Sequence, residues 1–225
     1  MKTAPGGGNL IVVDNSKDDE YHTQLNNRRV PYWSCGPTSA INALRAADYE
    51  LPNTGSQQPE DALTEFLTSE AAYAIMDLQS PWYRANGYEP YMVHAVLAWG
   101  INEFMGRDVD TFQTTWHVKD LMQIILDGGA LIMSGEFTTT GHMISVVGFE
   151  YTDKEIGLML EHFSWRKVLK VIVDDPFGNW HTDYRSRAGN GIRFSRREFN
   201  NLTQEIGRKS AKWAHVIRRN KQHGT

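Results

Sequence analysis

Apolar positions in the first part of the chain recur at helical spacing. After residue 36, Ile41 and Leu44 lie on one side of a helix that begins near Pro37, since proline fits a first helical turn. Farther on, Pro59 precedes two acidic residues, which are favourable at the positive end of a helix dipole. Similar periodicity occurs twice more before residue 130. We therefore predict four helices, at about 37–47, 59–76, 90–105 and 117–129.

The pattern changes after residue 129, where short segments rich in β-branched and aromatic residues predict strands. These segments are bounded by glycine, threonine or proline. A further helix is predicted over 195–206, where Ser195 is a suitable N-cap. Helices come first, strands come later and the two seldom alternate, which predicts an α+β fold. The predicted strands of this part are 130–137, 142–151, 168–175 and 212–219.

The N-terminal segment predicts a flexible arm over residues 1–20 with one short strand at Leu10–Val13. We expect one domain over 21–225, with a basic C-terminal part from about 185. No apolar run approaches the roughly 18 residues that a spanning helix needs, so no membrane span is expected. The arm also lacks the pattern of a signal peptide. These features predict a cytoplasmic protein, whose export would need another route.

Charge is distributed unevenly along the chain. Residues 185–225 hold eleven of the 23 Lys and Arg residues but two of the 27 acidic residues. This part is therefore near +9, and residues 1–184 are near −13. If this basic part forms one face, it would fit an anionic polymer as partner, and nucleic acid is the less favoured type of polymer. The simpler alternative, to which we give more weight, is that the basic part balances the acidic body.

The chain has one cysteine, Cys35, just ahead of the first predicted helix. A lone cysteine excludes an internal disulfide framework and is compatible with a reducing compartment. It is either a small buried residue or a nucleophile. At a helix N-terminus, unpaired backbone N–H groups and the positive end of the dipole favour a thiolate over a thiol. This position favours the second interpretation if partners for the sulfur exist.

Candidate partners for a nucleophilic thiol occur elsewhere in the sequence. His142 begins a predicted strand, where a sheet edge would aim a general base rigidly. Asp174 and Asp175 end another strand, and alternation places only one of them on the His142 side. A developing oxyanion needs donors, for which Gln24 and the backbone N–H of Cys35 are candidates.

Three further residues are expected to border a bound substrate: Gly36, Gly141 and Trp180. Glycine beside the nucleophile would let a peptide chain approach closely. Other aromatic residues, among them Trp33, are expected to be core rather than cleft. We expect no metal site, because neither HExxH nor paired CxxC motifs occur, and no cofactor.

Four stretches carry a family resemblance. They are TQLNNRRVPYWSCGPTSAINAL, LMQIILDGGALIM, GHMISVVGF and VIVDDPFGNW, and together they extend over most of the chain. They resemble the papain-like cysteine peptidases of the bacteriocin leader-peptidase group, which cut at double glycines. The resemblance implies a papain-like fold in which the nucleophile begins a helix packed on an antiparallel sheet. It implies Cys35 as nucleophile, His142 as general base and acid, and Gln24 as oxyanion donor. The orienting acid would be Asp175, with Asp174 as the alternative.

These observations favour a cysteine peptidase or amidase that forms and then hydrolyses a thioester. As substrate we expect bacterial cell-wall peptides, an endolysin-like role, because the chain is compact and its basic part would fit an anionic wall. The first alternative is a protease that processes proteins or leader peptides. An acyltransferase would use the same residues. An alternative of another class is a non-catalytic binding module with a basic anion-binding face, against which the complete set of four site residues argues.

Overall fold

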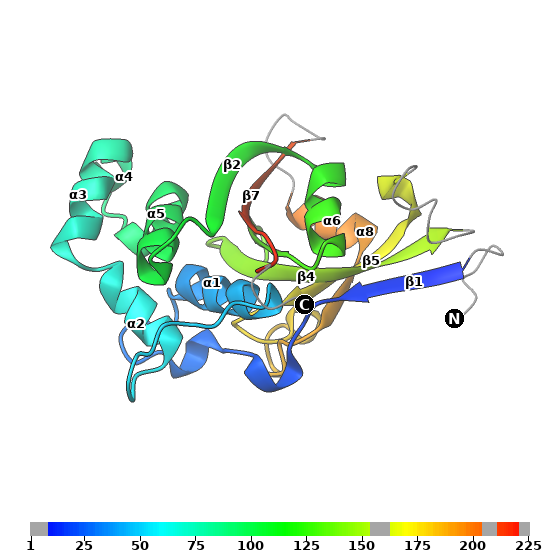
Figure 1. Ribbon diagram of the computed structural model, residues 1–225, viewed down its shortest axis with the longest axis horizontal. Helices are drawn as coiled ribbons and strands as arrows, with labels where there is room; N and C mark the ends of the chain where they lie inside the picture. Colours follow the sequence, from blue (N-terminus) through cyan, green and yellow to red (C-terminus); the bar gives the residue numbers. More distant parts are fainter. Residues whose placement is uncertain (1–8, 154–162, 204–210, 221–225) are drawn as a thin grey trace.

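The computed structural model describes residues 9–153, 163–203 and 211–220, and these form a mixed structure around one sheet (Figure 1). The strands are β1 (Asn9–Asp14), β2 (Asp110–His117), β3 (Ala130–Gly135), β4 (His142–Asp153), β5 (Val168–Asp174), β6 (Ile192–Ser195) and β7 (Ala211–Ile217). Six of these strands pair antiparallel in the order β2-β7-β3-β4-β5-β6. The seventh, β1, pairs antiparallel with β4 beyond the residues of β4 that pair with β3.

Helices cover both faces of this sheet. They are α1 (Cys35–Ala46), α2 (Pro59–Phe66), α3 (Glu70–Gln79), α4 (Pro81–Ala85), α5 (His94–Met105), α6 (Val118–Leu126) and α8 (Arg196–Leu202). One buried cluster joins the sheet to α1, α2, α3 and α5, and a second joins its other face to α6 and α8. On β3, Ile132 belongs to the first cluster, whereas Leu131 and Met133 belong to the second. Burial on both faces explains why the central strands are almost continuously apolar.

Helix α1 is buried over nearly its whole length against β4. Its sequence, CGPTSAINALRA, supplies the small side chains that such close packing requires. Two buried hydrogen bonds fix the helix on the strand: Ser39 Oγ donates to the Met143 carbonyl at 3.0 Å, and Ser145 Oγ donates to the Ser39 carbonyl at 2.8 Å. These bonds hold the first residue of α1 and the first residue of β4 in a fixed relation.

The predicted α+β class, with a helix that starts at the cysteine and packs on an antiparallel sheet, is confirmed. The helix expected over 59–76 is two helices, α2 and α3. The break comes at Ser69, whose side chain accepts a hydrogen bond from the Ala72 N–H and caps α3. The strand β2 was not predicted, because its sequence DTFQTTWH is mostly polar and partly exposed. The short elements α4 and β6 were also not predicted.

The chain ends differ in part from the expectations. The strand predicted at Leu10–Val13 is present as β1 and is paired along β4, so residues 9–14 belong to the sheet. The rest of the predicted arm before residue 9 lies outside the described residues. In the parts that the structure describes, no helix is both long and apolar enough to span a membrane.

Two arginines of the basic C-terminal part form ion pairs with acidic residues of the body. Arg193 pairs with Asp14 and Glu150, at 3.5 and 3.0 Å. Arg219 pairs with Asp48 at 3.1 Å. These contacts agree with the simpler explanation of the charge asymmetry. Binding of an anionic polymer stays a prediction.

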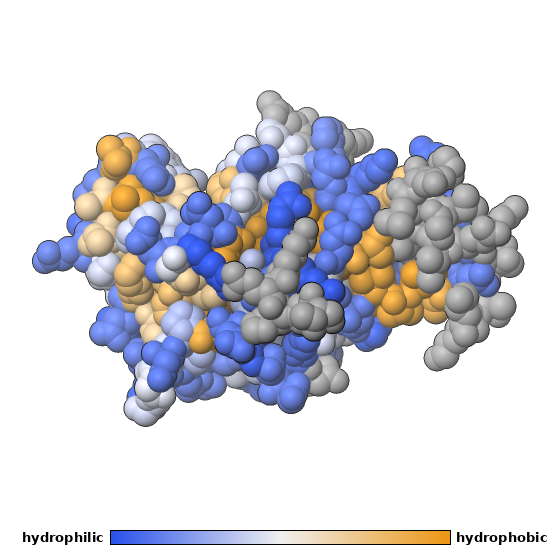
Figure 2. Space-filling view, viewed as in Figure 1, coloured by the Kyte–Doolittle hydropathy of each residue, from blue (hydrophilic) through white to orange (hydrophobic). Residues whose placement is uncertain are grey.

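The helical part between α1 and β2 extends away from the sheet. Its end, formed by α3 and α4, shows an apolar area on the surface (Figure 2). Leu78 and Trp82 are the large exposed side chains there, 78% and 62% accessible. This part supplies much of the first buried cluster and also one wall of the cleft described next.

Candidate active site

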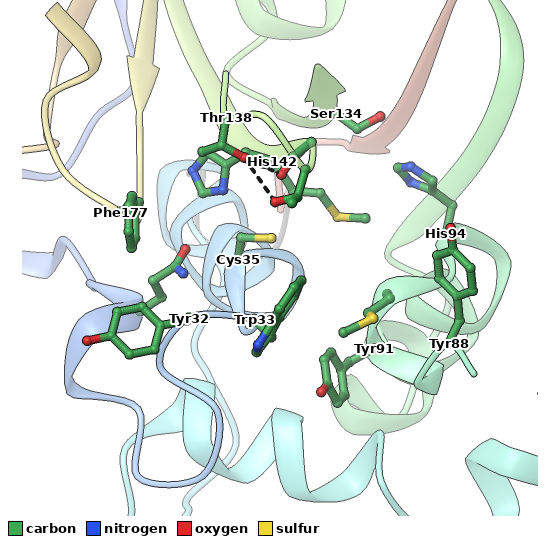
Figure 3. A pocket seen from close by; sticks show the side chains of 15 residues that line it. Tyr32, Trp33, Cys35, Tyr88, Tyr91, His94, Ser134, Thr138, His142 and Phe177 are labelled. Atoms are coloured by element: carbon green, nitrogen blue, oxygen red, sulfur yellow. Dashed lines mark hydrogen bonds between the residues drawn. The ribbon is translucent and has the colours of Figure 1, made fainter. Parts of the chain in front are cut away.

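A cleft of about 370 Å³ lies where α1, β4 and α5 begin, beside the loop that follows β5 (Figure 3). Cys35 lies in the middle of this cleft. His142 lies on one side of the cysteine and His94 on the other. The cleft therefore brings together residues from four regions that are far apart in the sequence.

Cys35 is half-buried at the first position of α1. Burial raises the pKa of its thiol, but the hydrogen bond and the charge of His142 outweigh this effect and lower the pKa below its ordinary value. Backbone N–H groups of Met143 and Gly36 donate to the sulfur and act in the same direction. The surroundings thus favour a thiolate, as a helix N-terminus predicts.

His142 is the first residue of β4 and is buried. Its Nε2 lies 2.8 Å from Oδ1 of Asp175, which is fully buried. The other ring nitrogen, Nδ1, is left for Cys35. Burial lowers the pKa of His142, but the hydrogen bonds and charges of Asp175 and Cys35 prevail and raise it. An imidazolium beside a thiolate is the arrangement that results.

The two adjacent aspartates have different surroundings. Asp174 accepts hydrogen bonds from Ser16 Oγ at 3.0 Å and from the Gly191 N–H at 2.9 Å. Asp175 points to His142 and also accepts from the Phe177 N–H at 2.9 Å. Alternation along the end of β5 separates the two side chains in this way. The structure therefore brings Asp175, and not Asp174, to the histidine.

Two tyrosines that sequence reasoning missed hold Asp175 in place. Tyr184 Oη lies 3.3 Å from Asp175 Oδ2, and Tyr21 Oη donates to the Asp175 carbonyl at 2.6 Å. Tyr184 has φ +60°, a left-handed conformation that is costly for a bulky residue and is often found at functional sites. No local motif indicates either tyrosine. The Asp-Pro-Phe-Gly stretch does indicate the bond from Phe177, because aspartate commonly accepts from the N–H two residues on.

Gln24 begins the 3₁₀-helix η2 (Gln24–Asn26) and is buried where it lines the cleft. Its backbone N–H donates to the Pro176 carbonyl at 2.9 Å, which joins this helix to the loop after β5. Its Nε2 donates to the Pro31 carbonyl at 2.9 Å. A side-chain amide has two hydrogens on nitrogen, so one donor remains for a ligand.

Comparison with known proteins gives the family. The description "Peptidase_C39 like family" matches residues 17–208, most of the chain and all the site residues described above. The chain belongs to this family. It is therefore a cysteine-type peptidase, as the sequence resemblance implied. A search of curated proteins found no match.

Two of the three residues expected to border substrate in this C39-like peptidase lie elsewhere. Gly36 faces the interior, where an added Cβ would lie 3.0 Å from the Tyr91 carbonyl oxygen and 3.1 Å from Met143 Sδ. Its small size serves helix packing rather than substrate approach. Trp180 packs against Phe194 in the second buried cluster and does not line the cleft.

Gly141 does line the cleft of the C39-like peptidase. It has φ +83°, and an added Cβ there would meet open space. The aromatic border expected from Trp180 is instead supplied by Phe177, whose ring centroid lies 6.0 Å from that of His142. A positive φ favours glycine at position 141 regardless of the available room.

The walls of the cleft are more aromatic than expected. Trp33, which we predicted to be core, is 51% exposed and lines the cleft together with Tyr32, Tyr88 and Tyr91. Within the described ranges, no group of three or more His, Cys, Asp or Glu side chains is arranged to hold a metal ion. What the cleft offers is a paired thiol and imidazole between aromatic surfaces.

Proposed function

We propose that this C39-like peptidase hydrolyses peptide bonds with Cys35 as nucleophile, His142 as general base and acid, and Asp175 as the group that orients the histidine. The observation that carries this proposal is the 2.8 Å contact of Asp175 with His142 at the cleft, where Cys35 and His142 are close enough to shift each other's pKa. Burial of the acid and the histidine keeps water from competing for their mutual bond.

In the first half of the reaction, the Cys35 thiolate attacks the substrate carbonyl carbon. The carbonyl π electrons move to oxygen, where the free Gln24 amide hydrogen and the Cys35 backbone N–H stabilise the oxyanion. The tetrahedral intermediate collapses, the C–N bond breaks, and Nδ1–H of His142 protonates the leaving amine. A thioester between Cys35 and the acyl part remains.

In the second half, His142 removes a proton from water as its oxygen attacks the thioester carbonyl. The C–S bond then breaks and releases a carboxylic acid and the thiolate, with the proton on His142 restoring the ion pair. Asp175 keeps Nε2 protonated throughout, so that Nδ1 is always the nitrogen that exchanges the proton. No cofactor takes part in this scheme.

For the substrate we propose bacterial cell-wall peptides, an endolysin-like role. The support is the cleft, whose exposed aromatic walls fit an extended peptide. A second support is a set of basic side chains that face solvent and lie in the loop after β5 or beyond it in the sequence. Arg185, Arg187 and Arg197 are exposed and suit an anionic wall. Leader peptides with a double glycine are the alternative, suggested by the sequence resemblance.

The test is incubation of the purified protein with wall-derived peptides and, separately, with a synthetic double-glycine leader peptide, followed by mass spectrometry of the products. We expect cleavage of the wall peptides, and none by the Cys35→Ala protein. Cleavage that survives Cys35→Ala would refute Cys35 as nucleophile. Cleavage of the leader peptide alone would keep the mechanism and overturn the wall substrate.

A further inference from the structure

Three aromatic rings form a strip that runs from the surface of α4 to the cleft, and the proposed mechanism does not use it. Trp82 and Tyr83 lie on α4, and Tyr88 follows the turn after that helix. The ring centroid of Tyr88 is 6.1 Å from that of Trp82 and 5.2 Å from that of Tyr83. Tyr88 also lines the cleft, where Figure 3 shows it on the same side of Cys35 as Tyr91. This aromatic strip is therefore continuous with the proposed peptide-binding site.

The short segment that carries the aromatic strip is rigidly folded. The Tyr88 N–H donates to the Tyr83 carbonyl at 3.0 Å, and the Asn86 side-chain amide donates to the Trp82 carbonyl at 2.7 Å. Gly87 has φ +77°, which permits the turn between these residues. Tyr83 packs on the first buried cluster and meets the other two rings edge-on, at interplanar angles of 86° and 85°. Trp82 and Tyr88 are thus preorganised, so a ligand that binds on their faces has few side chains to order.

The aromatic strip combines apolar area with hydrogen-bonding groups. Trp82 is 62% exposed and Tyr88 is 41% exposed. The Tyr88 ring ends in a hydroxyl group, and the exposed side chain of Asn86 is bonded beside Trp82. A wholly apolar partner would bury such polar groups without satisfying them, which costs free energy. The strip therefore fits a ligand with an apolar face and a polar edge. A pyranose ring has this character, because its axial C–H bonds stack on aromatic rings while its hydroxyl and acetamido groups form hydrogen bonds.

The charge of the helical part disfavours anionic partners. Residues 59–108 contain eight acidic and two basic residues, so their net charge is near −6. The basic residue on α4, Arg84, is engaged within the protein: its guanidinium lies 4.0 Å from the ring centroid of Tyr73 and 3.9 Å from the carboxylate of Asp77. A nucleic acid or an anionic lipid surface would be repelled from this end of the molecule. A neutral sugar would not be repelled.

We propose that the aromatic strip binds N-acetylated sugar units of a cell-wall substrate, which stack on Trp82 and Tyr88 while the attached peptide enters the cleft. Peptides of a bacterial wall are joined to chains of such sugars, so the sugar is the part of this substrate that lies just outside the peptide. The inference rests on the proposed function and deepens it, because it names the second chemical component of the substrate and the surface that holds it.

The first measurement is the binding of tetra-N-acetylchitotetraose, a chain of N-acetylglucosamine units, to the full chain with Cys35→Ala. This background makes the result independent of catalysis. Saturation transfer by NMR from the aromatic protons of the protein to the C–H protons of the sugar reports stacking, and a titration gives the Kd. Trp82→Ala and Tyr88→Ala should each weaken binding about tenfold or more, as the truncation of an aromatic anchor does. Tyr88→Phe, which keeps the ring, should retain most of the affinity.

Leu78→Ala is the matched control, because Leu78 is 78% exposed at the same end of the molecule but has no aromatic face. It should leave sugar binding unchanged. Two other occupants are tested in parallel: a lipid surface by sedimentation with phosphatidylcholine vesicles, and a second copy of the chain by light scattering. Vesicle binding or dimerisation that Trp82→Ala abolishes, in a protein that does not bind the sugar, would overturn the inference.

The second measurement separates this inference from the proposed function. With Cys35 intact, KM and kcat are compared for a wall fragment that keeps its sugar and for the same peptide without sugar. Trp82→Ala should raise KM about tenfold for the first substrate and leave both constants unchanged for the second. Equal effects on the two substrates, or no binding of the chitotetraose, would overturn the inference and leave the Cys35 mechanism standing. Sugar binding by a protein that cleaves neither substrate would overturn the proposed function and leave the sugar-binding surface standing.

Discussion

Two carboxylate–imidazole pairs lie near the cleft, and they differ in the group that contacts the second ring nitrogen of the imidazole. Asp175 orients His142, whose other nitrogen meets a thiol. Asp110 orients His215, whose other nitrogen meets a second imidazole, that of His94. The pKa of His142 is raised because two anionic partners favour its charged form. The pKa of His94 is lowered because burial and the neighbouring His215 disfavour its charged form.

The difference shows that an acid–histidine pair does not by itself define a catalytic centre. The same pairing lies beside a thiol whose pKa is lowered on one side of the cleft and beside an imidazole whose pKa is lowered on the other. The predictions that follow concern the side of the cleft that holds Cys35, His142 and Asp175. Most of them compare a residue of this side with a control residue of the same type elsewhere in the chain. They are ordered by the size of the expected effect.

Asp175→Asn should reduce peptide cleavage by roughly 10²- to 10⁴-fold, because the amide no longer fixes the tautomer of His142 or stabilises the imidazolium. The measurement is kcat/KM on a peptide found in the cleavage screen. The control is Asp174→Asn, next in sequence, which we expect to keep activity within about threefold. Because its carboxylate accepts bonds from Ser16 and Gly191, this variant should instead lower the free energy of unfolding, by about 1–3 kcal/mol. Equal losses of activity in the two variants would contradict the assignment.

Gln24→Ala should reduce kcat by about 10²- to 10³-fold with a smaller change in KM, since an oxyanion donor acts mainly in the transition state. Gln123→Ala, on α6 at the other face of the sheet, should leave both constants unchanged. A change confined to KM in Gln24→Ala would indicate a binding role instead.

The pH dependence of Cys35 alkylation by iodoacetamide should reveal the lowered pKa of the thiol. A lowered pKa means that the thiolate persists as pH falls below the usual value of about 8.5, and reactivity is lost only below the lowered pKa. The His142→Ala variant lacks the hydrogen bond and the charge of His142, which lower the pKa of Cys35, whereas the burial that raises this pKa remains. The pKa of Cys35 should therefore be higher in the variant. At pH 6 we expect the unmodified chain to react about tenfold faster or more. Coincident profiles for the two proteins would refute the ion pair.

Tyr184→Phe should have the smallest effect, a reduction of kcat of about fivefold. The variant keeps the ring that packs on Phe177 and removes one hydroxyl group beside Asp175, which corresponds to about 1 kcal/mol. The acid limb of the plot of kcat against pH should shift as well, because the Tyr184 hydroxyl lies within hydrogen-bond distance of the Asp175 carboxylate. Tyr83→Phe, in the helical part, is the control and should leave the profile unchanged.

The sequence predicts most of the first side of the cleft and none of the second. Cys35 and His142 stand at the start of a helix and a strand, and those boundaries are marked by local motifs. By contrast, β2 was not predicted, since its alternating polar residues carry a weak signal, and so the meeting of Asp110 with His215 could not be foreseen. In the helix predicted over 90–105, nothing in the sequence distinguishes His94 from the neighbouring positions.

Corrections at the substrate side have a similar cause. The expectation for Gly36 and Trp180 rests on their closeness in sequence to Cys35 and Asp175. The direction of a side chain within a loop or first helical turn depends on neighbours that are remote in sequence. Gly36 faces the Tyr91 carbonyl, and Trp180 turns toward Phe194. Phe177 lines the cleft, with Tyr184 packed behind it, because the loop after β5 folds back through the bond from the Asp175 N–H to the Gly189 carbonyl.

The position of β7 also bears on when the enzyme becomes active. β7 follows β2 and β3 in the sequence, yet it lies between them in the sheet, and β1 pairs with the distant β4. Pairings between such remote segments form slowly and only once both segments have been synthesised. A nascent chain thus presents Cys35 as an ordinary thiol long before His142 and Asp175 can reach it. The lowered pKa of Cys35 is therefore a property of the folded protein and not of the early part of the chain.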